Sequence, residues 1–209
     1  MKYYFIKNKI NFLFLFISFF YLILIIGVDN ISFQSTGWLH AGNDRTLPQL
    51  GWHFFKNDIW RFPLGSNPNY GDELGSSIIF ADTIPILALI FKMFRSLIPD
   101  NFQYISLWYF ICFYLQLFFS FKIIKKFTNS VLYSLIGSFF FLITPIFMWK
   151  LAMIPALAGQ WTLLIALYLG LSKKIDQAKW SWFFLIILSS LINFYFMIMI
   201  IAAYSLLRI

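Results

Sequence analysis

Charged residues are scarce in this sequence, and cysteine is almost absent. Of the 209 residues, 11% are charged, 61% are hydrophobic and one is a cysteine, Cys112. A lone cysteine excludes an internal disulfide and a thiolate metal site. A soluble domain of this length could not hide so much apolar surface. Because long apolar runs without charge are typical of transmembrane helices, the composition predicts an all-α, polytopic integral membrane protein.

Acidic residues are fewer than basic ones, with 8 against 16, and the formal net charge is +8. The basic residues form no stripe with interleaved aromatic residues, so we predict no nucleic-acid partner. They gather in short clusters between apolar runs, as in loops on the cytoplasmic side of a membrane. The sequence therefore predicts a multi-pass protein of the inner (cytoplasmic) membrane, with membrane lipid as a partner.

Five apolar runs predict five transmembrane helices. The first run follows three lysines and lacks a small-residue cleavage site, which favours a retained anchor with a cytoplasmic N-terminus. The expected spans are residues 10–28, 103–121, 131–149, 155–171 and 180–207. The last run continues almost to residue 209, so we expect one membrane domain over residues 1–209 that is the N-terminal part of a longer protein.

A sixth apolar run, residues 77–97, is not counted as a span. It carries residues that are costly or disruptive within a membrane: Asp82, Pro85, Lys92 and Arg95. If it does not cross, the lysine clusters at residues 122–126 and 173–179 both face the cytoplasm, as the positive-inside bias favours. We therefore expect an interfacial or shallow re-entrant helix at 77–97, inside one long external loop of residues 29–102.

The external loop begins with a polar stretch, "AGNDRTLPQLGWHFFKND". Thr46 as a candidate N-cap and Pro48 in the first turn predict a short amphipathic helix, with Asp44 just ahead of it. We expect Trp52, Phe54 and Phe55 to lay this helix on the lipid surface. The later stretch "FPLGSNPNYGDELGSS" is rich in Gly and Pro, which predicts turns and argues against a helix or strand.

Candidate chemistry also lies in this external region. The five expected spans contain no Asp, Glu, Lys, Arg or His, and Gln116 and Asn193 are the amides well inside them. Pumps and proton-coupled transporters need ionisable groups at mid-membrane. The absence of such groups from the expected spans argues against a transporter, so a transporter fragment ranks only third among the hypotheses. A carboxylate beside an apolar surface suits a general base, and cations beside it can hold a phosphate. His40 and His53 are thirteen residues apart and have no zinc-site spacing.

The motifs "GND", "LGWHFF", "FPLGSNPNYGDELGSSIIFADTIPILAL" and "FQYISLWYFICFYLQ" carry a resemblance. Their order resembles the C-type (GT-C) membrane glycosyltransferases, and more narrowly an uncharacterised bacterial family of that superfamily, in which the first motif is usually Gly-Gly-Asp. The resemblance covers residues 29–120 well and the remainder weakly. It implies transfer of a sugar from a polyprenyl-phosphate-linked sugar to a cell-envelope glycan or lipid acceptor at the external face.

The resemblance also implies site residues. Asp44 matches the catalytic base or metal ligand, so a divalent metal ion is a candidate cofactor. Asp82 would lie near the same cleft, and Lys150 with Arg45 or Arg61 would balance the lipid-phosphate leaving group. The sequence departs from that family where histidines are expected, since it has Met153–Ile154, Gln160 and Asn193 at those points. The alternative hypothesis is a non-catalytic membrane subunit or scaffold of envelope assembly.

Overall fold

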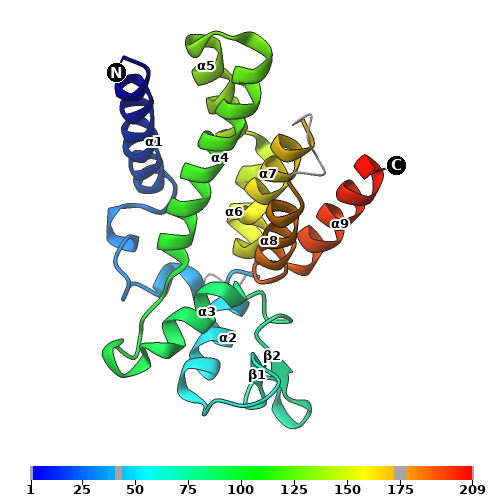
Figure 1. Ribbon diagram of the computed structural model, residues 1–209. Coiled ribbons are helices and arrows are strands. Elements are labelled where there is room, and N and C mark those ends of the chain that lie inside the picture. Colours follow the sequence, from blue (N-terminus) through cyan, green and yellow to red (C-terminus); the bar gives the residue numbers. More distant parts are fainter. Residues whose placement is uncertain (1, 41–43, 172–177, 209) are drawn as a thin grey trace.

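Helices make up most of the protein in a computed structural model that describes residues 2–40, 44–171 and 178–208. They form a bundle of apolar helices and, below it, a lobe made by residues 28–104 (Figure 1). The bundle contains α1 (Lys2–Ile26), α4 (Ile105–Thr128), α5 (Val131–Leu142), α6 (Pro145–Met153), α7 (Trp161–Gly170), α8 (Lys179–Ser190) and α9 (Phe194–Arg208). The all-α prediction is confirmed.

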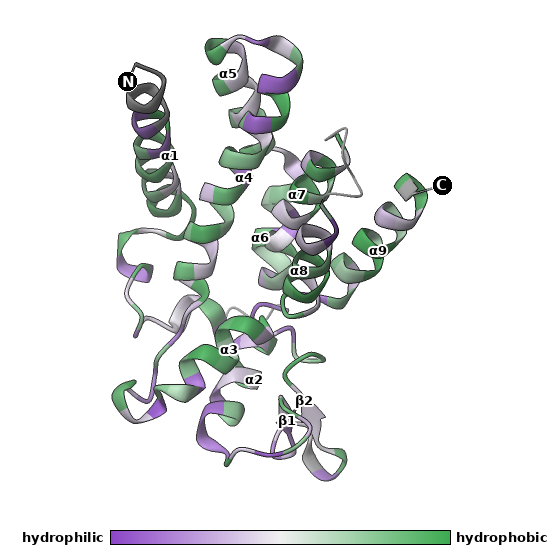
Figure 2. Ribbon diagram, in the orientation of Figure 1, coloured by the Kyte–Doolittle hydropathy of each residue, from purple (hydrophilic) through white to green (hydrophobic). Residues whose placement is uncertain are grey.

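The central helix of the bundle is α4, which packs against α1, α5 and α7. Aromatic side chains fill the contact with α1, where the Phe14 and Phe121 rings meet edge to face at 5.5 Å. Such edge-to-face pairs suit the opposite charges of ring face and ring edge. The bundle helices are mostly hydrophobic, whereas the lobe mixes polar and apolar residues (Figure 2).

The prediction of five spans is wrong for the part of the chain that the structure describes. Two helices are long and apolar enough to cross a membrane, Asn8–Ile26 and Ile105–Thr128. A third span exists if α5 and α6, which meet at a bend of 41°, cross together. Pro145 begins α6 and causes this break, because proline cannot donate the backbone hydrogen bond of a continuous helix.

The run at residues 180–207 is two helices rather than one span. The chain breaks between Ser190 and Phe194, and α8 and α9 pack against each other. With 12 residues, α8 is only about 18 Å long, against a hydrocarbon core of about 30 Å. The expected span at 155–171 is likewise a 3₁₀ turn, η5 (Pro155–Gln160), followed by the 10-residue α7.

The lobe is built around two short helices, α2 (Thr46–Asn57) and α3 (Pro85–Met93), which pack against each other. Its other elements are the 3₁₀ turns η1 (Val28–Asn30), η2 (Gly37–His40), η3 (Asp72–Leu74) and η4 (Arg95–Leu97) and the antiparallel strands β1 (Ser66–Asn67) and β2 (Ser76–Ser77). The strand pair corrects the expectation that this stretch holds turns alone. Left-handed glycines, Gly71 and Gly75, reverse the chain between the two strands.

The expected helix in the polar stretch exists as α2, but its surroundings differ from the prediction. Trp52 and Phe55 are each 1% exposed, so they face the protein core rather than lipid. The Trp52 ring packs edge to face on Tyr104, at the start of α4. Thr46 does not cap the helix, because its hydroxyl donates to the Leu39 carbonyl at 2.9 Å. The helix thus ties the lobe to the bundle.

Residues 77–97 form no continuous helix. They begin in β2 and a turn, and the helix α3 starts only at Pro85. With nine residues, α3 is too short to cross a membrane, which agrees with the expectation that this run is not a span. The turn before α3 carries Asp82.

Candidate functional site

A strained turn presents Asp82 at the junction of the lobe and the bundle. Asp82 and Ile84 both have left-handed backbone conformations, with φ of 50° and 53°. That conformation is uncommon for residues other than glycine, and for a β-branched isoleucine it is a genuine outlier. Between them, Thr83 donates to the Ile78 carbonyl at 2.7 Å, and its own carbonyl accepts from the Tyr104 hydroxyl. Strain of this kind persists where surrounding structure fixes it, often at functional sites.

The break between α8 and α9 holds this turn from the bundle side. Asn193 Nδ2 donates to Asp82 Oδ1 at 2.9 Å, and the Ile86 amide donates to the Leu191 carbonyl at 2.8 Å. Asn193 is 7% exposed, and its own Oδ1 accepts from the Tyr195 amide. The sequence places Asn193 inside a span, so its pairing with Asp82 was not predicted. A lone amide in an apolar run is the signal that marks it.

Asp44 is exposed and lies two residues before the start of α2. Burial raises the pKa of Asp82 above its ordinary value; the Asn193 hydrogen bond opposes the rise, and the negative charge of Asp44 adds to it. Of these three effects on the pKa of Asp82, the charge of Asp44 is the smallest. A carboxylate whose pKa is raised at a partly desolvated site is a candidate for acid–base chemistry.

Arg45, the next residue, extends from the lobe into the bundle. Its Nε donates to the Ala152 carbonyl near the end of α6. Arg45 also lines a cavity of about 330 Å³, together with residues of α1, α4 and α6 that include Tyr109 and Met148. The Tyr109 hydroxyl donates to the Leu151 carbonyl at 2.6 Å. A partly buried guanidinium, next in the chain to the exposed Asp44, thus borders this cavity.

Lys150 lies on the same helix, α6, two residues before the Arg45 contact. Its Nζ donates to Gln160 Oε1 at 3.1 Å and lies 6.0 Å from the centre of the Phe196 ring. In the sequence, Gln160 is noted only because it stands where the resembled family has a histidine. In the structure it holds Lys150 at the edge of η5, and Phe196 follows Asn193 by one turn.

Arg61 lies at the end of α2 opposite to Arg45, away from the junction of lobe and bundle. It pairs there with Asp58, with Arg61 Nε 3.3 Å from Asp58 Oδ2. Asp58 is buried, and its Oδ1 accepts from the Ile59 amide while its carbonyl accepts from Arg95. Burial alone would raise the pKa of Asp58, but these bonds and the charges of Arg61 and Lys92 hold it below its usual value. Arg61 therefore has a structural partner away from Asp44.

The two histidines border one pocket of about 350 Å³ on the lobe, with Asp100 on the same wall. Within the residues that the structure describes, no group of three or more His, Cys, Asp or Glu could hold a metal ion. The candidate site is thus the junction of lobe and bundle, which holds Asp82 with its partner Asn193, the adjacent residues Asp44 and Arg45, and Lys150.

No curated protein and no solved structure matches the chain. One protein family matches residues 15–208, which include the whole junction of lobe and bundle. The chain therefore belongs to the family described as "Domain of unknown function (DUF6311)".

Proposed function

We propose that this protein is a membrane glycosyltransferase of the GT-C type. It moves a sugar from a polyprenyl-phosphate donor to a cell-envelope glycan or lipid acceptor. The observation that carries the proposal is that Arg45 from the lobe and Lys150 of the bundle both lie at the end of α6, with the exposed Asp44 next to Arg45 in the chain and a cavity beside Arg45. The resemblance of residues 29–120 to that superfamily supports it.

Asp44 supplies the general base of the proposed reaction. In the reaction, the acceptor hydroxyl oxygen bonds to the anomeric carbon of the sugar, its proton passes to Asp44, and the carbon–oxygen bond to the lipid phosphate breaks. Asp44 is exposed and can meet an acceptor, whereas Asp82 is fixed by Asn193. Proton removal by a positioned side chain typically contributes about 10²–10⁴-fold to a rate.

The cations receive the leaving group, which departs with the electron pair as polyprenyl phosphate. Arg45 and Lys150 both reach the end of α6, one from the lobe and one from the helix itself. A guanidinium can bind two phosphate oxygens at once, and positive charge at a developing anion is the larger part of such catalysis.

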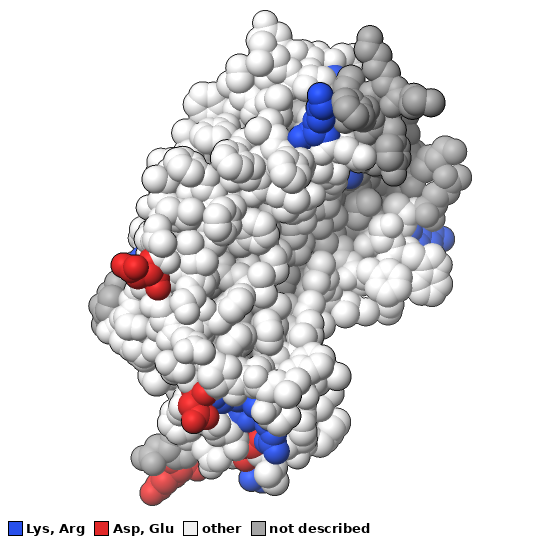
Figure 3. All heavy atoms as spheres, turned by 90° about the vertical axis from the view of Figure 1, so that its left-hand side faces the viewer, with Lys and Arg blue, Asp and Glu red and all other residues white. Residues whose placement is uncertain are grey.

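The proposed location is the cytoplasmic membrane, with the N-terminus in the cytoplasm and the lobe outside. On the face in Figure 3, acidic side chains lie at mid-height and below, basic ones lie near the top, at the right edge and at the bottom, and most of the surface between them is uncharged. An uncharged belt of this kind suits lipid, and lysines at the end away from the lobe suit the cytoplasmic side. The junction then lies at the external surface of the cytoplasmic membrane, where the protein can bind a lipid-linked sugar.

The test uses membranes from cells that overproduce the protein and from cells that lack it. A labelled polyprenyl-phosphate sugar is added, and the release of free polyprenyl phosphate is measured. The proposal expects release only with the protein, reduced by Lys150→Gln at unchanged protein abundance. Loss of envelope glycan in cells without the protein, but no release in either membrane, would favour the scaffold instead.

A further inference from the structure

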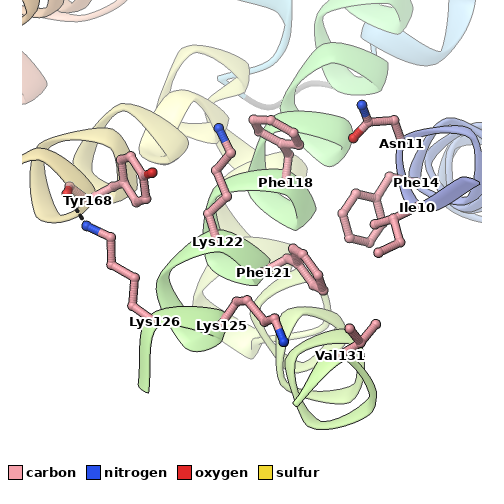
Figure 4. Close-up of a pocket in the computed structure, with 10 residues that line it drawn as sticks. All are labelled: Ile10, Asn11, Phe14, Phe118, Phe121, Lys122, Lys125, Lys126, Val131 and Tyr168. Carbon is pink, nitrogen blue, oxygen red and sulfur yellow. Dashed lines mark hydrogen bonds between the residues drawn. The ribbon is translucent and has the colours of Figure 1, made fainter. Parts of the chain in front are cut away.

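A pocket on the lobe is lined by none of the residues of the candidate site. It has a volume of about 350 Å³, and three separate segments of the chain form its walls. These segments contribute His40 of η2, Gln49, Leu50 and His53 of α2, and Asp100 and Asn101 before α4. A pocket of similar volume at the far end of the bundle differs in chemistry, because its lining is mostly apolar with three lysines (Figure 4).

The side chains of the lobe pocket can both donate and accept hydrogen bonds. The polar groups are amides, imidazole rings and a carboxylate, which belong to Gln49, Asn101, His40, His53 and Asp100. An amide both donates and accepts, a neutral imidazole does the same, and a carboxylate accepts. A ligand that could only accept would leave the carboxylate unpaired, and one that could only donate would leave the amide hydrogens unpaired. Hydroxyl groups do both, so the pocket matches a ligand with several hydroxyls.

Acceptor oxygens in this pocket are left unused by the protein itself. Gln49 is 6% exposed, and its Nε2 donates to the Phe102 carbonyl at 3.4 Å. Asn101 Nδ2 donates to the Gln34 carbonyl at 3.2 Å. Among the residues that the structure describes, neither amide oxygen accepts a hydrogen bond. A buried acceptor without a partner destabilises a protein unless water or a ligand donates to it, so Gln49 Oε1 marks a point where a ligand hydroxyl can bond.

The charge at the pocket favours a neutral ligand. Asp100 is the acidic residue that lines it, and no lysine or arginine is among the described lining residues. The Asp100 carboxylate is fully exposed and would repel an anion. Lys56 Nζ lies 3.9 Å from Asp100 Oδ1, and its positive charge weakens the attraction of Asp100 for a cation. A neutral hydroxyl can still donate a charge-assisted hydrogen bond to the carboxylate, which is stronger than a bond between neutral groups.

Apolar surface completes the match. Leu50 is 36% exposed at the pocket, and the two histidine rings each present an apolar face beside their polar nitrogen atoms. A pyranose sugar has the same two-sided character, with C–H groups on its ring faces and hydroxyl groups around its edge. Ligand pockets range from about 300 to 1,000 Å³, so this pocket, near the lower limit, suits a single sugar unit.

We propose that this pocket binds one neutral sugar unit of a cell-envelope glycan. Asp100 and Gln49 accept from its hydroxyls, the imidazole rings donate to it, and its C–H face packs on Leu50. In the proposed transfer this glycan is the acceptor, so the role of the bound sugar rests on the proposed function. The binding itself needs neither a lipid-linked donor nor transfer, and it is tested separately.

Saturation-transfer difference NMR of the purified protein tests the binding. The protein is kept in a detergent without a sugar headgroup, and methyl glycosides of glucose, galactose, mannose and N-acetylglucosamine are added in turn. We expect at least one of them to bind at millimolar concentration. Asp100→Ala should weaken that binding about ten-fold or more, because a hydrogen bond to a charged group is lost. The Asp100 side chain is fully exposed, so the substitution should leave the protein folded.

The matched control is Glu73→Ala, which removes an exposed carboxylate of the same lobe outside the pocket. It should leave the binding unchanged. Equal losses in the two variants, or no binding of any of the four glycosides, would overturn the proposal. Methyl glucuronide, which carries a carboxylate on the glucose ring, should bind more weakly than the neutral glycosides that bind, and tighter binding of it would also overturn the proposal.

The sugar pocket and the proposed transfer can fail separately. Release of polyprenyl phosphate without glycoside binding would refute the sugar pocket alone. Glycoside binding without release would refute the transfer and leave the sugar pocket supported.

Discussion

Asn193 Nδ2 donates a hydrogen bond to Asp82 Oδ1 across 2.9 Å and so connects the break between α8 and α9 to the turn before α3. The two residues are 111 positions apart. Beside this bond, the Ile86 amide donates to the Leu191 carbonyl, so both chain segments are fixed together. A carboxylate of raised pKa is thereby held at the edge of the bundle, within the influence of Asp44.

Asp82→Asn should stabilise the protein at neutral pH. The asparagine keeps an acceptor oxygen for Asn193 but removes a charge that burial and Asp44 disfavour. Because the folded-state pKa of Asp82 is raised, its contribution to stability is full below its unfolded pKa of about 3.9 and is lost as pH rises through the folded value. We expect a small rise in Tm at pH 7 that shrinks towards pH 4. Thermal unfolding in detergent measures it, and a Tm gain independent of pH would contradict this account of Asp82.

Gly51→Ala should displace the Asp82 turn. A β-carbon at Gly51 would lie 2.5 Å from both Ala81 Cβ and Thr83 Cγ2, so α2 and the turn could not keep their distance. Overpacking of this kind costs about 1–3 kcal/mol of unfolding free energy. The matched control is Gly37→Ala, where an added β-carbon meets nothing within 4 Å. A loss of stability at Gly37 as large as at Gly51 would show that the close contact is not the cause.

Asp58→Asn should destabilise the lobe, because Asp58 accepts from Ile59 and pairs with Arg61. Its folded-state pKa is lowered, so its contribution is present above the unfolded pKa of about 3.9 and disappears as pH falls through the folded value. The deficit in Tm should be full at pH 7 and shrink in acid. Asp100→Asn is the control, because the Asp100 side chain is fully exposed and forms only a long ion pair, with its Oδ1 3.9 Å from Lys56 Nζ. A larger loss at Asp100 would refute the role assigned to Asp58.

Labelling of cysteines in intact cells tests the proposed orientation. Leu74 is 96% exposed on the lobe, and Phe127 is 69% exposed at the end of α4. A membrane-impermeant thiol reagent should label Leu74→Cys and should label Phe127→Cys only after the cells are opened. The native Cys112 is completely buried and should stay unlabelled. External labelling at position 127 would reverse the proposed topology.

The sequence predicts α1 of the bundle and α2 of the lobe more closely than it predicts α4. The first span is predicted closely because lysines precede it. The helix α2 is predicted closely because turn residues precede it. The end of α4 is missed by seven residues, because the helix continues through its three lysines to Thr128. The break at residues 191–193 contains neither glycine nor proline. Its local signal is Asn193, whose side chain accepts from the Tyr195 amide at the start of α9, as an N-cap residue does.

The candidate site is predicted in part. Asp44 and Asp82 are expected near one cleft from the resemblance, which stays a prediction; the charge of Asp44 adds the smallest of three contributions to the pKa of Asp82. Arg61 is near Arg45 in sequence, but the 12-residue α2 between them separates their backbones by roughly 18 Å. The partner of Asp82, Asn193, could not be predicted, because its position depends on a chain reversal that the apolar run hides.

The central claim is that Asp44 is the catalytic base, and Asp44→Asn tests it most directly. Release of polyprenyl phosphate from a labelled lipid-linked sugar is measured in membranes that contain equal amounts of each variant. The control is Asp29→Asn, an exposed carboxylate of the same lobe that lies outside the junction. We expect a loss of about 10²–10⁴-fold for Asp44→Asn and an unchanged rate for Asp29→Asn. Equal and mild effects of the two substitutions would contradict the claim and leave Asp44 as a solvated loop residue.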